Sequence, residues 1–265
     1  MVHVRLVIMG NIISDLDLSK ITHWKSELFT IEKEVKRGIL PQKADSPNGN
    51  WEYSDLLLED TFSKMNYTSP VDITFFIIDA PIQDNWLNRI LSGNRIVITY
   101  YQVKEILQKE NIPLENYILV RIYMYGLLWM AKSNKELTQN DEYAILHDYR
   151  ENCLYDTCGI KSEVIYKCVQ PIICEQCKAY LMSHGVAKDD VYIAEREQKK
   201  LKRNLYYRLV HRLKSYPIIT FMLSCCLAIA LSVVANAISE CYSNLLIIVP
   251  CLLFCILWYL LQNKH

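Results

Sequence analysis

The sequence predicts an α/β (α+β) soluble domain that ends in a small cysteine-rich ribbon and is followed by a C-terminal transmembrane hairpin of two helices. Three observations predict this arrangement. Strand-like and helix-like segments alternate over the first 135 residues. Five of the ten cysteines fall in residues 153–177, and no cysteine precedes them. Residues 215–263 contain a single charged residue, Glu240. The predicted divisions are therefore a core over 1–135, a ribbon over 136–195, a basic helix over 196–216 and two spans within 217–263.

Composition excludes some classes of function. Lys and Arg together number 29, as do Asp and Glu, so the formal net charge is zero and does not indicate a nucleic-acid-binding protein. The apolar run at residues 2–9 is too short for a secretory signal, and acidic residues follow it where small residues would mark a cleavage site. We therefore expect the first domain to lie in the cytosol.

The first 65 residues predict two strands and two helices. Residues 2–9 are β-branched and predict a strand, and residues 13–28 show helical spacing, with Ser14 or Asp15 as the N-cap. Residues 29–35 alternate with period two and predict a half-exposed strand. Turn residues fill 39–51, and a helix is expected over 53–65.

The next segment predicts the centre of the domain. Residues 71–79 form an almost continuous apolar run, which is typical of a central buried strand. A further strand is expected over 94–101 and a short helix over 103–110. Residues 114–132 are apolar nearly all round, and the position of Arg121 near their middle favours a helix buried in the core.

The clustered cysteines predict a metal site. In a cytosolic domain disulfides are disfavoured, and the Cys174-x2-Cys177 pair has the spacing of a zinc knuckle. A tetrahedral zinc then needs two ligands from an earlier segment, where the candidates are His147, Cys153, Cys158 and Cys168. Both a four-cysteine set and a set of one histidine and three cysteines satisfy the spacing. Four protein ligands leave no position for water, so the zinc would be structural.

The order of these features resembles the archaemetzincin type of metallopeptidase, in which an H-E-x-x-H-x-x-G-x-x-H helix precedes C-x4-C-x-M-x17-C-x2-C. Cys153 stands at the second cysteine of that pattern, Tyr155 at the methionine, and Cys174 and Cys177 at the last pair. The first cysteine would fall at Asp148, beside His147. The resemblance therefore implies His147, Cys153, Cys174 and Cys177 as metal ligands, with Cys158 as the substitute for His147.

The predicted active-site helix departs from the family pattern. Alignment on Gly126 places Leu119, Val120, Tyr123 and Trp129 where the catalytic histidines and glutamate belong, and no H-E-x-x-H occurs in the chain. Leucine and valine side chains can neither bind zinc nor accept a proton. The resemblance thus implies a catalytically inactive metzincin-like domain. Asp79 and Asp84 follow a predicted buried strand, where α/β proteins place sites, but a turn or capping role is the favoured interpretation.

The C-terminal part predicts membrane insertion. Residues 217–238 contain no charge and are long enough to cross a hydrocarbon core of about 30 Å, and a second apolar run covers 244–261. A basic belt precedes the first run, so both termini are expected in the cytosol of a multi-pass inner or plasma membrane protein. The belt consists of Lys199, Lys200, Lys202, Arg203, Arg208, Arg212 and Lys214.

Together these features predict a membrane sensor or effector without catalytic activity, such as those found in prokaryotic antiviral defence. The expected partners are the lipid bilayer, further copies of the chain through the hairpin, and an unidentified protein or small ligand for the first domain. A membrane-tethered adaptor and an enzyme with an unrecognised site are the alternatives.

Overall fold

The first part of the chain is built on a six-stranded sheet of order β2-β1-β4-β6-β5, with β3 also paired to β1. All pairings are parallel except that of β5 with β6. The apolar run of β4 is buried throughout, as predicted for a central strand. The strands are β1 (Val2–Met9), β2 (Phe29–Ile31), β3 (Lys36–Gly38), β4 (Ile73–Ile78), β5 (Asn88–Leu91) and β6 (Arg95–Thr99).

The computed structural model describes residues 1–11, 13–46, 51–65, 67, 69–148, 150, 152–201, 209 and 216–239. Within the last of these ranges, side chains are described at 216, 218 and 221–235. The chain divides into two units, Met1–Asn204 and Leu205–His265.

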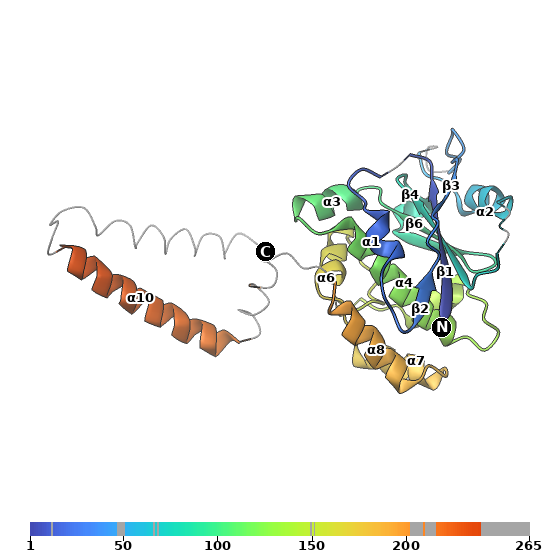
Figure 1. The fold of residues 1–265 in the computed structure, drawn as a ribbon. Helices are drawn as coiled ribbons and strands as arrows, with labels where there is room; N and C mark the ends of the chain where they lie inside the picture. Colours follow the sequence, from blue (N-terminus) through green and yellow to red (C-terminus); the bar gives the residue numbers. More distant parts are fainter. Residues whose placement is uncertain are drawn as a thin grey trace. The chain divides into compact units, whose positions relative to one another are not determined.

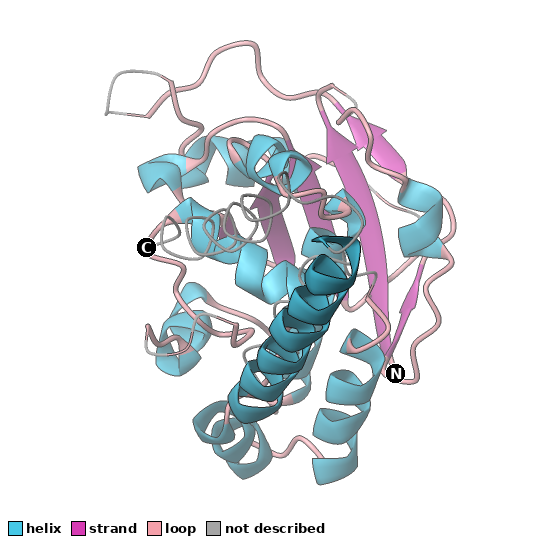
Figure 2. Ribbon diagram, turned by 90° about the vertical axis from the view of Figure 1, so that its left-hand side faces the viewer, coloured by secondary structure: helices cyan, strands magenta, loops and turns pink. Residues whose placement is uncertain are grey.

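Helices cover both faces of the sheet (Figures 1 and 2). Helix α2 (Asp55–Ser63) lies on one face, where Phe62 stacks on Phe76 with ring centroids 4.0 Å apart. Helices α1 (Leu18–Thr22), α3 (Val103–Lys109) and α4 (Leu114–Met130) lie on the other face. The alternation of side chains along the strands therefore produces two apolar layers, one against α2 and one against α4.

Helix α4 is the central helix of this unit. It begins after Pro113, and all its residues except Trp129 and Met130 are buried. Arg121 is only 3% exposed, which agrees with its predicted place in the core. Phe75 of β4 and Tyr125 of α4 pack with ring centroids 6.0 Å apart, so aromatic side chains join the helix to this face of the sheet.

Two predicted elements are shorter in the structure. The helix expected over 13–28 is wrong beyond Leu18–Thr22, because Asp15 has a left-handed backbone (φ 65°) and Asp17 caps the helix by accepting a hydrogen bond from Ser19 N. Ser14 and Asp15 are therefore not the N-cap. The strand expected over 29–35 ends at Ile31, and Lys36–Gly38 then pairs separately with β1.

The cysteine-rich segment differs from the expected ribbon because it is mostly helical. It contains α5 (Gln139–Ile145), η2 (Lys161–Glu163), α6 (Val164–Val169), α7 (Glu175–Ser183) and α8 (Lys188–Gln198). Among the described residues of this segment, strand-like pairing is limited to two isolated bridges, His147 with Asp156 and Cys153 with Ile172. This segment belongs to the same unit as the sheet.

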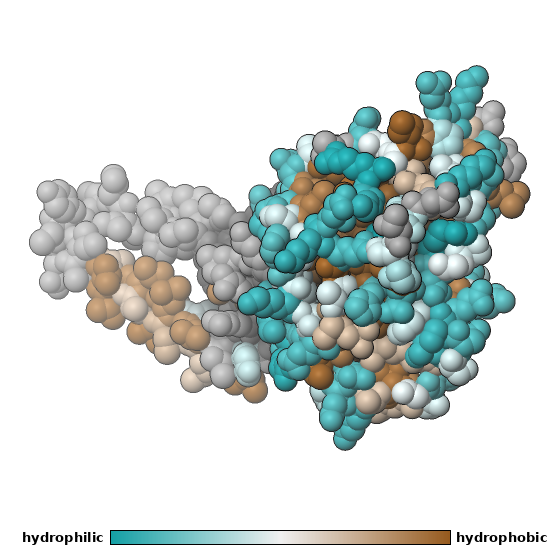
Figure 3. All heavy atoms as spheres, turned by 45° about the vertical axis from the view of Figure 1, so that its right-hand side comes forward, coloured by the Kyte–Doolittle hydropathy of each residue, from teal (hydrophilic) through white to brown (hydrophobic). Residues whose placement is uncertain are grey.

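In the second unit the structure describes helix α10 (Pro217–Ser239). Its described part is mostly apolar in colour, whereas the visible face of the first unit is largely hydrophilic (Figure 3). Among the described residues, no helix is both long and apolar enough to cross a membrane, so they do not support the predicted hairpin. The second predicted span, 244–261, lies outside the described residues, as do Lys202, Arg203, Arg208, Arg212 and Lys214 of the basic belt.

Candidate metal centre

The first candidate ligand, His147, is held by backbone pairing just after α5. Its N–H donates to Tyr155 O (3.0 Å), and its carbonyl accepts from Thr157 N (2.7 Å). These bonds fold residues 147–157 into a tight loop. The loop brings His147 beside Cys153, although no helix or strand contains both residues.

The other three ligands come from this loop and from the start of α7. Leu154 N donates to Ile172 O (2.9 Å) and Ile172 N to Asn152 O (3.0 Å), which fixes Cys153 beside the chain that leads into α7. Cys174 is the N-cap of α7 and Cys177 lies in its first turn. Both thiols therefore lie at a helix N-terminus, whose positive end favours thiolates.

The four side chains converge on one point. Their ligand atoms, one from each of His147, Cys153, Cys174 and Cys177, all lie within 4.8 Å of one another. Cys153 Sγ lies 3.8 Å from Cys177 Sγ, and Cys174 Sγ lies 3.5 Å from His147 Nε2. With Zn–S and Zn–N bonds of about 2.3 and 2.0 Å, a tetrahedron needs edges of roughly 3.5–3.8 Å. The donor set and its spacing fit a structural zinc.

The electrostatics of the cluster also suit a cation. The hydrogen bond between the Cys153 and Cys177 sulfurs, with the backbone N–H of Cys174, lowers the pKa of Cys153 to about 5, although burial opposes this. The same contact raises the pKa of Cys177, because a second thiolate would face the first. A bound zinc ion removes this conflict by neutralising several thiolates at once.

Cys158 and Cys168 lie outside this cluster. Cys158 has a left-handed backbone (φ 52°), and its N–H donates to Asp156 Oδ2 at 3.0 Å. Cys168 is fully buried on α6. The structure therefore brings together the histidine with three cysteines rather than the four-cysteine alternative.

Three of the four positions expected to carry catalytic ligands on α4 hold buried side chains instead, and the fourth, Trp129, is half-buried. Leu119 and Val120 are buried. The Tyr123 hydroxyl accepts from Trp24 Nε1 (2.9 Å) and donates to Glu197 Oε2 (2.7 Å). Trp129 Nε1 donates to Lys135 O at 3.0 Å. Beside Gly126 lies a small apolar hollow lined by residues such as Phe29 and Leu127. Among the described residues, the His147 cluster is the one group of metal-binding side chains.

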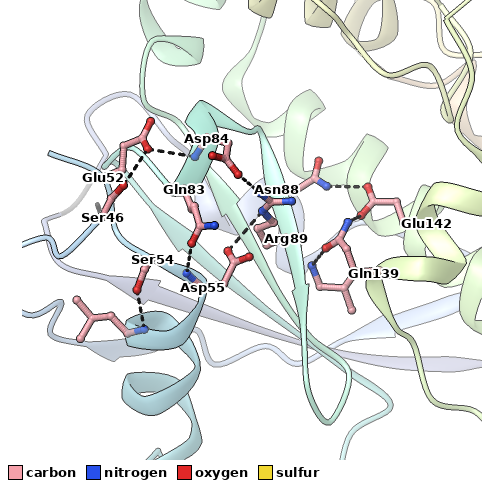
Figure 4. A network of polar contacts seen from close by, with 12 residues as sticks. Ser46, Glu52, Ser54, Asp55, Gln83, Asp84, Asn88, Arg89, Gln139 and Glu142 are labelled. Carbon is pink, nitrogen blue, oxygen red and sulfur yellow. Dashed lines mark hydrogen bonds and ion pairs between the residues drawn. The ribbon is translucent and has the colours of Figure 1, made fainter. Parts of the chain in front are cut away.

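The polar residues near Asp84 form a structural network (Figure 4). Arg89 of β5 pairs with Asp84 (3.0 Å) and with Asp55 (3.4 Å), and burial raises the pKa of Asp55. Asp79 pairs with Lys104 at 2.7 Å. The two aspartates noted in the sequence are thus engaged in ion pairs.

The same network continues to the edge of the sheet. From α5, Gln139 Oε1 accepts from Ile90 N (3.1 Å) and Glu142 Oε1 accepts from Asn88 Nδ2 (2.8 Å). The Tyr143 hydroxyl accepts from Arg89 Nη1 at 3.1 Å. Side chains of α5 therefore contact three successive residues of β5, and Gln139 accepts from one backbone N–H of this edge strand.

Three buried charged residues were not predicted as site residues. Glu197 and Lys167 are each 1% exposed, and Arg121 was noted only for its place in the core. Glu197 accepts from Ser26 Oγ (2.6 Å) and Glu27 N (2.8 Å) as well as from Tyr123. No local sequence signal marks these residues, because their partners are distant along the chain.

Comparison with known proteins gives one distant likeness. The crystal structure of archaemetzincin from Methanopyrus kandleri aligns with 69% of this chain and 94% of its own, with a TM-score of 0.44 and 16% sequence identity. No protein-family model matches the sequence, and no curated protein matches it.

Proposed function

We propose that the chain is a membrane-anchored effector without peptidase activity. Its first unit would be a sensor domain that a structural zinc stabilises. The observation that supports the proposed anchor is the apolar surface of α10, although the described part of this helix falls short of what a membrane span needs. Residues 221–234 are all exposed, and they include Phe221, Leu223, Leu227 and Ile229 at 61–67% exposure. An exposed apolar surface of this extent requires a partner, and a helix apolar all round suits lipid.

The sequence around α10 supports the same proposal. Residues 217–238 and 244–261 contain no charged residue, and the turn between them contains only one, Glu240. Basic residues precede the first run, and Lys264 follows the second. This charge distribution favours cytosolic termini, with the turn on the opposite side of the membrane. Small residues in the first run would let copies of the helix pack closely.

The absence of peptidase activity is proposed from α4. The positions aligned with the catalytic set hold two aliphatic side chains, a tyrosine and a tryptophan. Tyr123 is the one residue of the four with a side-chain oxygen, and its hydroxyl is hydrogen-bonded to Trp24 and Glu197 inside the core. These four side chains cannot form a binding site for a metal ion that activates water.

Membrane anchoring is tested by fractionation of cells that express the full chain. We expect the wild type in the carbonate-resistant membrane pellet, and L227R/I229R released from it, because two arginines at a helix centre cost about 5–7 kcal/mol on insertion scales. Leu56→Arg is the matched control, since Leu56 is 83% exposed on α2. Wild-type protein in the supernatant would rule out the anchor.

Two further assays test the role of the first unit. Purified full chain should not cleave peptides, and cleavage that EDTA abolishes would refute an inactive domain. A membrane-potential dye then separates an effector from an adaptor. Depolarisation that requires residues 217–261 supports the effector, whereas an unchanged potential with a bound cytosolic partner supports the adaptor.

A further inference from the structure

Helix α6 carries a lysine whose side chain is enclosed by the protein. Lys167 is 1% exposed, although lysine is almost never fully buried unless its charge is paired or hydrogen-bonded. Removing an ammonium group from water is unfavourable unless new contacts compensate for the lost hydration. The contacts of Lys167 therefore indicate what this side chain does.

These contacts lie on the loop that carries the metal ligand Cys153. Lys167 Nζ donates to Leu154 O (3.2 Å) and to Asp156 O. Both acceptors are main-chain oxygens of residues that closely follow Cys153 in the sequence. The lysine therefore holds the main chain of the ligand loop.

Neighbouring carbonyl groups of this loop have different partners. Leu154 O and Asp156 O accept from Lys167. Tyr155 O, which lies between them in the sequence, accepts from His147 N at 3.0 Å. This alternation is that of an extended chain, in which successive carbonyls face opposite edges. The loop is thus held along one edge by the metal ligand His147 and along the other by Lys167.

Two further hydrogen bonds connect both sides of this contact to α4. Asn116 Nδ2 of α4 donates to Cys168 O at 2.9 Å, and Cys168 is the chain neighbour of Lys167 on α6. The Tyr155 hydroxyl donates to Met124 O of α4, also at 2.9 Å. Helix α6 and the ligand loop are therefore tied to the same helix, and the Lys167 amine has a fixed place beside the loop.

We propose that Lys167 is a positioning residue of the metal centre. Its side chain fixes the main chain at residues 154–156 and thereby places Cys153 and His147 around the ion. Groups that orient metal ligands commonly change metal affinity about 10–100-fold when they are removed. The inference rests on the structural zinc of the proposed sensor domain and is independent of the membrane anchor.

The test measures the zinc affinity of the full chain in detergent by competition with a fluorescent chelator. Lys167→Met keeps the length of the side chain and removes its donors, so we expect the Kd for zinc to rise about 10–100-fold. The visible absorption spectrum of the Co²⁺-loaded protein should also change, because it reports the geometry of the ligands, whereas a loss of stability alone would leave it unaltered. A wild-type Kd in a folded Lys167→Met protein would overturn the proposal.

Two controls separate this effect from the loss of a nearby charge and from lower stability. Lys178→Met removes a cation next to Cys177 in the sequence, where Lys178 pairs with Glu195 at 3.0 Å. Glu197→Ala weakens the fold away from the ligand loop, because Glu197 accepts a buried hydrogen bond from Tyr123 at 2.7 Å. Both controls, measured while folded, should keep the wild-type Kd and Co²⁺ spectrum. A rise in Kd as large as that of Lys167→Met in either control would contradict a positioning role.

Wild-type protein decides the question if Lys167→Met does not fold. Zinc removal should loosen the loop and expose the Lys167 amine to acetic anhydride, whereas Lys104, which pairs with Asp79 at 2.7 Å, should keep its rate of acetylation. Continued protection of Lys167 without zinc, or an equal change at Lys104, would contradict the proposal. Wild-type protein that binds no zinc would refute the metal centre and this inference together. Zinc-loaded wild type with an unaffected variant would refute this inference alone.

Discussion

The Nε2 atom of His147 lies 3.5 Å from the Sγ atom of Cys174, although 27 residues separate them in the sequence. The contact joins the loop after α5 to the N-terminus of α7, and Cys153 and Cys177 complete the same cluster. Because all four donors come from the protein, a zinc ion here would stabilise the fold and leave no position for a reacting water.

Removal of one ligand should abolish metal binding. We expect about one zinc per chain in the wild type and much less in Cys174→Ser or His147→Ala, measured by elemental analysis of the full chain. The free energy of unfolding should fall by several kcal/mol in both variants, since metal binding contributes to folding. Cys158→Ser is the control and should retain its zinc. Loss of zinc in that control alone would make Cys158 the ligand in place of His147.

The sequence predicts a strand well where a continuous apolar run fits a buried strand better than any other element. Strand β1 was expected over 2–9 and is found there, and β4 lies within the predicted 71–79. The predicted first helix is too long. Asp17 accepts a capping hydrogen bond from Ser19 N, and this contact outweighs the helical spacing of the apolar residues that precede it. Cysteine spacing left two ligand sets open, and the family resemblance favoured the set of His147, Cys153, Cys174 and Cys177, whose ligand atoms lie together in the structure. The hydrogen bonds from Lys167 to Leu154 O and Asp156 O could not be predicted, because they depend on how α6 packs against the loop at 154–156.

Glu197 should be a large contributor to stability. Its buried carboxylate accepts three hydrogen bonds, from Ser26, Glu27 and Tyr123, and so ties α8 to α4 and to the loop before β2. Glu197→Ala leaves these donors without an acceptor and should cost about 3–5 kcal/mol in urea unfolding followed by tryptophan fluorescence. Glu195→Ala removes a partly exposed ion pair with Lys178 and should cost about 1 kcal/mol or less. Equal effects would show that the buried contacts of Glu197 contribute little.

Gly126 should be replaceable with a gain in stability. A Cβ atom at this position in α4 meets nothing within 4 Å, and the neighbouring hollow is lined by apolar side chains. Gly126→Ala should raise the free energy of unfolding by about 1 kcal/mol, because alanine has the higher helix propensity. Gly38→Ala should have the opposite effect, since its Cβ would overlap Met9 and Met65. Destabilisation by Gly126→Ala would show that the helix cannot accept a side chain there.

The ion pair between Arg5 and Glu32 should make stability depend on pH in the acid range. Arg5 Nε and Nη2 donate to the two carboxylate oxygens of Glu32 at 2.7 and 2.9 Å. These hydrogen bonds lower the pKa of Glu32 from its ordinary value of 4.5, although burial opposes this. A lowered pKa means that the stabilisation is complete above pH 4.5 and is lost as the pH falls through the lower value in the folded protein. Glu32→Gln should therefore be destabilised by about 1–3 kcal/mol at pH 7, and the difference from wild type should shrink towards pH 2. Glu34→Gln, at the exposed pair with Lys36, should follow the wild-type curve at every pH. A constant difference between Glu32→Gln and wild type would show that ionisation of Glu32 does not stabilise the fold.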